Sequence, residues 1–124
     1  MNLVEIINDL RACTLVRDCT KKINEYNNES LRTLLALTYN TDLPATWDEI
    51  EANLRYVYTP NDGNLESLVQ WINANLDVDK QVFIETVCAF LKHTTPESNA
   101  IAVGMLQGDL GIKLSRVLAR KLKR

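Results

Sequence analysis

Residues 79–106 read DKQVFIETVCAFLKHTTPESNAIAVGML, and this stretch decides the fold class. In its first half, apolar residues recur three and four positions apart, which is the spacing of one face of an α-helix. Thr95-Pro96-Glu97 then has the composition of a helix start, with a capping hydroxyl, proline at the first helical position and an acid in the first turn. A second apolar stripe follows over residues 101–106. The stretch therefore predicts two consecutive helices, the first of which begins near Asp79.

The same helical period continues on both sides of this pair. Further apolar stripes cover residues 3–10, 16–23, 31–38, 65–72 and 112–122. Thr14 can act as the N-cap of the second helix, and Thr46 with Glu49 has capping-box spacing for a helix through about Arg55. No segment shows the sustained alternation that is typical of a β-strand. We therefore expect an all-α fold, a compact bundle of about seven to eight helices.

Composition is consistent with one domain spanning residues 1–124. The chain has 124 residues, of which 46% are hydrophobic and 24% are charged, and this suits a single core. Residues 59–64, TPNDGN, are all turn formers and predict a loop that joins the two halves of the domain. No apolar run approaches the roughly 20 residues that span a bilayer, and residues 1–5 lack the pattern of a signal peptide. We expect a cytoplasmic protein without a membrane partner.

The sequence gives little support to catalysis or to a cofactor. It contains neither a Walker loop nor a GxGxxG motif, and its carboxylates are scattered. The single His93 has no convincing nucleophile beside it. The three cysteines, Cys13, Cys19 and Cys88, form no CxxC pair and predict reduced, buried thiols rather than a zinc site. We expect a non-enzymatic protein that needs no cofactor and no metal.

Charge is distributed unevenly along the chain. The net charge of −2, from 14 basic and 16 acidic side chains, argues against a general nucleic-acid binder. Residues 42–85, however, hold nine acids and only two basic residues, whereas six basic residues follow Asp109 without another acid. The turn Gly108-Asp109-Leu110-Gly111 is predicted to open the last helix, where backbone N–H groups and the helix dipole favour an anion. Duplex DNA, bound through its phosphates, is the partner that this pattern favours.

Two groups of cations could contact phosphates. In the last helix, Arg116, Arg120 and Lys123 recur at i, i+4 and i+7 and would share one face. A second group lies in the N-terminal third, around a turn at residues 13–15 that offers another helix start; its members are Arg11, Arg17, Lys21, Lys22 and Arg32. The tryptophans and tyrosines lie at helical spacing among apolar positions, so we interpret them as core residues and not as base-stacking groups.

Several short motifs resemble the helical DNA-binding domain that precedes the nucleotidyltransferase domain in phage-type ATP-dependent DNA ligases. The resemblance begins with residues 6–10, IINDL, and with the segment Leu37-Thr38-Tyr39. It continues through residues 65–68 and 82–91 to residues 105–111, MLQGDLG. It covers nearly the whole chain, although its motifs are short and mostly apolar.

The resemblance implies an all-helical bundle that grips the minor groove of nicked duplex DNA through backbone amides and basic or hydroxyl side chains, largely independently of sequence. By position it implicates Gly111, Lys113, Ser115 and Arg116, with Thr14 as a looser match. Lys113 departs from the pattern, because the family tends to keep a small residue there, often glycine. The chain also lacks the family's Lys-x-Asp-Gly motif and the length for its catalytic domains. The resemblance therefore implies a stand-alone relative, phage-encoded and acting in the host cytoplasm, that cannot seal nicks.

The sequence thus predicts a sequence-independent duplex-DNA-binding protein. Its predicted contact residues are Gly111, Lys113, Ser115, Arg116, Arg120 and Lys121 near the C-terminus, with Thr14 and Arg17 near the N-terminus. The alternative is a phage protein-interaction module or inhibitor of a host enzyme, which would bind a host or phage protein through the acidic middle of the chain. A structural role within a virion ranks third.

Overall fold

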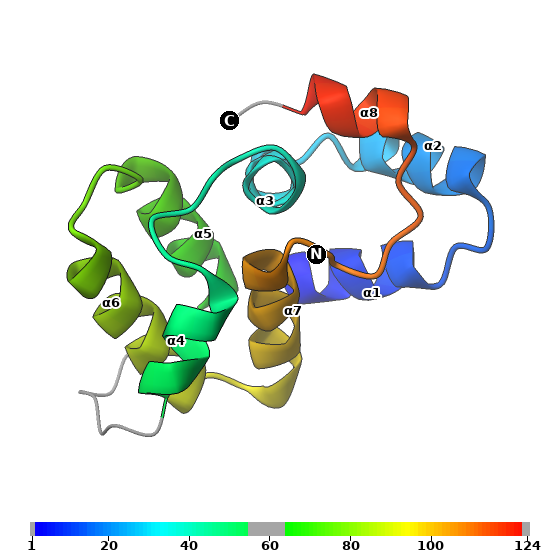
Figure 1. The fold of residues 1–124 in the computed structure, drawn as a ribbon. Helices are drawn as coiled ribbons and strands as arrows, with labels where there is room; N and C mark the ends of the chain where they lie inside the picture. Colours follow the sequence, from blue (N-terminus) through cyan, green and yellow to red (C-terminus); the bar gives the residue numbers. More distant parts are fainter. Residues whose placement is uncertain (1, 55–63, 123–124) are drawn as a thin grey trace.

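The protein is all α in the computed structural model, which describes residues 2–54 and 64–122. This part of the chain contains eight helices and no strand, as the helical periodicity predicts (Figure 1). The helices are α1 (Leu3–Arg11), α2 (Val16–Tyr26), α3 (Glu29–Tyr39), α4 (Trp47–Asn53), α5 (Leu65–Ala74), α6 (Lys80–His93), α7 (Pro96–Gln107) and α8 (Arg116–Lys121). The predicted loop at residues 59–64 lies outside the described residues, apart from Asn64, which caps α5.

Local sequence accounts for most helix starts. Thr46 and Glu49 form the predicted capping box of α4, Asp79 caps α6, and Thr95 caps α7 with Pro96 at its first helical position. Each of these side chains accepts a hydrogen bond from a backbone N–H that the helix itself leaves unpaired. These three starts follow the prediction because every group involved lies within a few residues of the others.

The predicted start of α2 is wrong. Leu15, not Thr14, is the N-cap residue, and no side chain makes a capping hydrogen bond there. Leu15 has an extended backbone, with φ −119° and ψ 141°, so the helix begins one residue later than a Thr14 cap requires. The exposed Thr14 hydroxyl therefore makes no capping contribution to α2.

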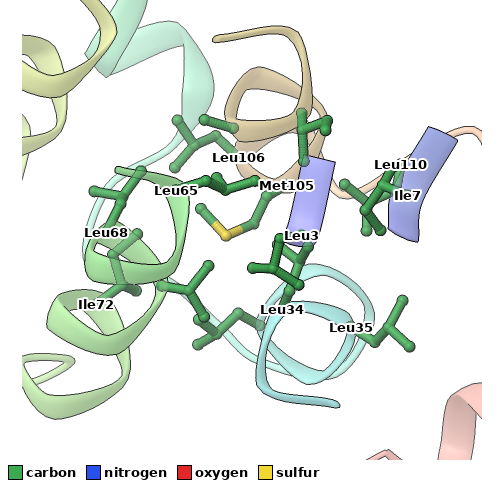
Figure 2. Packing of buried hydrophobic residues seen from close by; sticks show 14 of the residues in the cluster. Leu3, Ile7, Leu34, Leu35, Leu65, Leu68, Ile72, Met105, Leu106 and Leu110 are labelled. Atoms are coloured by element: carbon green, nitrogen blue, oxygen red, sulfur yellow. The ribbon is translucent and has the colours of Figure 1, made fainter. Parts of the chain in front are cut away.

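The core is built around α3, which contacts α1, α5, α7 and α8. Leu31, Leu34 and Leu35 of α3 are completely buried. Figure 2 shows Leu34 and Leu35 packed among apolar side chains from the surrounding helices, which include Leu3, Ile7, Leu65, Leu68, Ile72, Met105 and Leu106. Burial of each such side chain contributes about 1.5–3 kcal/mol, so this cluster is the main source of stability.

The helices separate into two ends. In Figure 1, α4, α5 and α6 lie at one end of the molecule and α1, α2 and α8 lie at the other, with α3 and α7 between them. Contacts of α4 and α5 with α6, and of α1 with α2, agree with this division, while α1 and α5 meet directly where the two ends join, as the hydrogen bond from Leu3 N–H to Glu66 Oε1 shows. Within the described ranges, no helix is long and apolar enough to cross a membrane. The division matters because it places the basic α8 at one end and the acidic α4 at the other.

A tight reversal follows α7 and directs the chain toward α1. Gly108 ends α7 in the left-handed region, at φ +86°, where glycine is favoured. Asp109 N–H then donates to the Gly104 carbonyl oxygen at 2.9 Å. A Cβ on Gly104 would lie only 2.8 Å from the Asp109 carbonyl oxygen, so a side chain at this position would displace the turn. The chain beyond this reversal carries most of the predicted contact residues.

Candidate nucleic-acid interface

Leu110 fixes the segment between α7 and α8 to the rest of the molecule. Its side chain is completely buried. Its N–H donates to the Tyr39 hydroxyl oxygen of α3 at 3.0 Å, and its carbonyl oxygen accepts from Arg11 Nε at the end of α1 at 2.8 Å. Burial raises the pKa of Tyr39, which keeps its hydroxyl neutral. Leu110 therefore positions the following residues against both α1 and α3.

Gly111 adopts a turn conformation instead of starting a helix. Its φ is +73°, and its N–H donates to Asp109 Oδ1 at 2.8 Å. The prediction that the 108–111 turn opens a helix and offers its amides to phosphate is therefore wrong for this amide. The Asp109 carboxylate already occupies the position that an anion would take at the Gly111 N–H.

The last described helix starts later and lies closer to the surface than predicted. α8 begins at Arg116, and its N-cap is Ser115, whose Oγ accepts from Leu118 N–H at 3.0 Å. None of its six residues is buried, and Val117 is 62% exposed. Leu122, just after the helix, is buried, and its carbonyl oxygen accepts from Asn40 Nδ2 at 2.5 Å. α8 is thus a short surface helix that is held at its C-terminal end and packs on α3.

The predicted cations of this region are exposed. Lys113, Arg116, Arg120 and Lys121 form no ion pair with any residue that the structure describes. Arg116 and Arg120 are one helical turn apart and share a face of α8. Lys123, the third member of the predicted stripe, lies outside the described residues. The described part of α8 can therefore offer two guanidinium groups to neighbouring phosphates.

The N-terminal group of cations is only partly available. Lys22 Nζ lies 2.9 Å from Asp9 Oδ1, and Lys21 Nζ lies 3.8 Å from Glu25 Oε1. The remaining members are Arg11, Arg17 and Arg32, of which Arg32 donates to the Asn27 side chain. Arg17 is exposed on the first turn of α2 and has no ion pair within the described ranges. Arg17 and Arg11 are therefore the cations of this group that remain for a ligand.

Asp9 explains why Lys22 is held away from a ligand. The Tyr26 hydroxyl donates to Asp9 Oδ2, and Lys22 donates to Asp9 Oδ1. These hydrogen bonds, with that of Tyr26 the larger effect, lower the pKa of the Asp9 carboxyl. The hydrogen bond between Lys22 and Asp9 also raises the pKa of Lys22. The three side chains form a local network that links α1 to α2.

Tertiary packing brings the two groups of cations to one end of the protein. Burial raises the pKa of the Cys19 thiol of α2, and a hydrogen bond with the Lys113 backbone partly offsets this rise. The segment before α8 therefore contacts α2. Arg11 of α1 contacts the same segment through Leu110. Figure 1 draws α8 next to α2, at the end of the molecule opposite α4, α5 and α6. We call this end of the molecule the basic end; its exposed cations are Arg11, Arg17, Lys113, Arg116, Arg120 and Lys121.

Arg11 belongs to the predicted N-terminal group of cations but is not among the predicted contact residues, and the structure makes it a stronger candidate. Its Nε is engaged by the Leu110 carbonyl oxygen, while its terminal Nη groups have no partner in the described part of the chain. It lines a groove of about 580 Å³ together with Gly104, Asp109 and Gly111. A guanidinium that is fixed through Nε can still offer both Nη groups to the two oxygens of one phosphate. Local sequence carries no signal of this contact, because Arg11 and Leu110 are far apart along the chain.

Comparisons with known proteins return no matching family model, no matching curated protein and no matching solved structure. The resemblance to the DNA-binding domain of phage-type ligases therefore stays a prediction.

Other predicted features behave mostly as core residues. Trp47, Trp71, Tyr26 and Tyr39 are half-buried and pack against the core, whereas Tyr56 and Tyr58 lie outside the described residues. None of the three cysteines forms a disulfide; Cys19 and Cys88 are buried and Cys13 is half-buried. In residues 2–54 and 64–122, no group of three or more His, Cys, Asp or Glu side chains could hold a metal ion.

Proposed function

We propose that this protein binds duplex DNA through its phosphate backbone, with little sequence preference and without catalysis. The observation that carries the proposal is the basic end, where cations from α1, α2, α8 and the segment before α8 share one surface. The acidic helices α4 and α5 lie at the other end (Figure 1), together with α6, which carries two lysines and one glutamate. A duplex can then contact several cations while the acids of α4 and α5 stay distant, although Asp18 and Asp109 lie beside Arg17 and Arg11. Local clustering of cations is how a protein with a net charge of −2 can still bind DNA.

The shape of the basic end supports backbone contacts more than base reading. α8 has six residues and is therefore only about 9 Å long. Its arginines and lysines are exposed and have no described partners that would fix them in one orientation. Such side chains neutralise phosphates without precise geometry, whereas base recognition needs a rigid arrangement of donors and acceptors. The resemblance to ligase DNA-binding domains points to the same partner.

Salt dependence provides the direct test of this function. If about four phosphates are neutralised, the logarithm of the association constant should fall with the logarithm of salt concentration with a slope of about −3.6. Affinity for a labelled duplex should then drop roughly 100-fold between 50 and 200 mM salt. Fluorescence anisotropy with intact, nicked and single-stranded DNA measures this. Absence of binding to every DNA at low salt, or a flat salt response, would contradict the proposal.

Arg11→Lys should weaken duplex binding about tenfold, although it preserves the charge. A lysine carries its three donors on one nitrogen atom and lacks the planar fork with which Arg11 can keep its Nε bond to Leu110 and bind two phosphate oxygens through Nη, and one charged hydrogen bond contributes about 1.5–3 kcal/mol. The matched control is Arg17→Lys, because Arg17 is exposed and has no anchoring bond; its affinity should stay within about twofold. The urea denaturation midpoint of each variant reports any loss of stability. Equal effects of the two substitutions would show that Arg11 contributes only its charge.

A further inference from the structure

A second groove lies away from the basic end. It has a volume of about 470 Å³ and lies between the C-terminal ends of α3 and α7, the loop at residues 41–46 and the first turn of α4. Leu37, Ala45, Met105 and Leu106 line it and are buried, so they form an apolar floor. Trp47, Asp42 and Asp48 also line it, and the two aspartates are exposed. The groove thus combines apolar surface with negative charge.

The two aspartates have no ion-pair partner among the described residues, whereas the threonine hydroxyl groups around them already form hydrogen bonds within the protein. Asp42 and Asp48 form no ion pair with a described residue. Two threonine hydroxyls in the lining donate to carbonyl oxygens of α3: Thr38 to Leu34 at 2.7 Å and Thr41 to Ala36 at 2.9 Å. The hydroxyl of Thr46 is used in the capping box of α4. Polar recognition in this groove would therefore come mainly from the carboxylates.

The backbone reinforces the negative potential of the groove. Both α3 and α7 end here, since Thr38, Gln107 and Gly108 line it. The C-terminus of a helix carries the negative end of the helix dipole and attracts cations. α4 begins at the same place, but Asp48 in its first turn offsets its positive end. Among residues 2–54 and 64–122, no lysine, arginine or histidine lines the groove.

The chemistry of the lining suits a long basic side chain. Trp47 offers an indole, and the face of an indole attracts ammonium and guanidinium groups. The apolar floor can bury the methylene stem of an arginine or lysine, while its charged head reaches the carboxylates at the rim. A volume of about 470 Å³ accommodates one or two such side chains but not a folded domain.

We propose that this groove binds an arginine- or lysine-containing segment of a partner protein. The charged head lies between Asp42 and Asp48, and the stem packs on the apolar floor. Charge complementarity decides the occupant, because two helix C-termini and two carboxylates converge on a groove to which the described residues contribute no cation. If the proposed DNA binding holds, the protein can bind DNA at one end and a basic protein at the other, and so bring the two together.

The test uses a short, labelled peptide that carries two arginines, together with a control peptide in which glutamine replaces each arginine. In nuclear magnetic resonance titrations of the whole protein, the Trp47 indole N–H resonance should shift saturably with the arginine peptide only. Trp71 serves as an internal reference, since it does not line the groove. Asp42→Asn/Asp48→Asn should weaken peptide binding at least tenfold, and Asp42→Asn alone should weaken it less.

The control variant is Asp77→Asn/Glu85→Gln, which removes the same charge from exposed positions outside the groove. It should keep the peptide affinity within about twofold. Equal losses in the two double variants would overturn the proposal, because they would indicate general attraction to an acidic protein. No peptide binding at low salt would also overturn it, as would concentration-dependent self-association that only the groove variant abolishes, since the occupant would then be a second copy of the chain.

Failure of this proposal can be distinguished from failure of DNA binding. Arg116→Glu/Arg120→Glu should bind the peptide as the unmodified protein does, whereas Asp42→Asn/Asp48→Asn should keep its DNA affinity or gain slightly from the lost negative charge. Measuring both ligands on both variants shows which surface is at fault. Loss of both activities in one variant would instead indicate a folding defect, which the circular dichroism spectrum would reveal.

Discussion

Arg116→Glu/Arg120→Glu should weaken duplex DNA binding roughly 100-fold or more, because two charged contacts of about 1.5–3 kcal/mol each are lost and replaced by repulsion. Both side chains are exposed on one face of α8 and have no described ion-pair partner. The slope of the logarithm of affinity against the logarithm of salt concentration should become shallower by about 1.8, the value for two phosphates. Anisotropy titrations at several salt concentrations measure both quantities.

The control separates local contacts from net charge. Arg116→Gln/Arg120→Gln and Gln70→Glu/Gln81→Glu each lower the net charge by two, but Gln70 and Gln81 are exposed on α5 and α6, at the end of the molecule opposite the basic end. We expect a clear loss of DNA affinity only in the first pair. A similar loss in the second pair would show that total charge, and not the basic end, determines the affinity. None of these exposed substitutions should change the free energy of unfolding by more than about 0.5 kcal/mol.

Leu110→Ala should lower the free energy of unfolding by about 2–5 kcal/mol, which is the usual cost of deleting most of a fully buried leucine side chain. Leu110 is completely buried, and its backbone bonds both Tyr39 and Arg11. The truncation leaves a cavity beneath the segment that leads to α8. Urea denaturation followed by circular dichroism gives the free energy directly.

Val117→Ala is the control for truncation of an apolar side chain, because Val117 lies on α8 and is 62% exposed. It should change stability by less than about 0.5 kcal/mol. A cost below about 1 kcal/mol for Leu110→Ala would mean that the segment is not anchored as described. At temperatures where Leu110→Ala stays folded, its DNA affinity should also fall, since the same residue positions the cations around it.

Local sequence predicted the helices well and their exact starts less well. Thr46, Asp79 and Thr95 act as predicted because capping depends on groups only two or three residues apart. Thr14 fails because the extended backbone of Leu15 delays the start of α2. At the last helix, the Asp109 side chain takes the Gly111 N–H and the helix begins only after Ser115.

The site was only partly predictable for a similar reason. Sequence identified Lys113, Arg116 and Arg120 as cations in a region without acids, and they are exposed in the structure. It could not show that Lys22 is paired with Asp9, or that Arg11 bonds Leu110. These contacts join residues on different helices, and helical periodicity reports which face of a helix is buried but not which helix lies opposite.

The sequence by itself determined the helical class, the positions of most helices and the separation of acidic from basic segments along the chain, because these depend on interactions within one or two turns. Only the tertiary structure decided that the N-terminal and C-terminal cations share one end, and that Asp42, Trp47 and Asp48 meet the ends of α3 and α7 around a groove. Packing of buried side chains on α3 fixes these relations, and that packing depends on how the surfaces of several helices fit together at once.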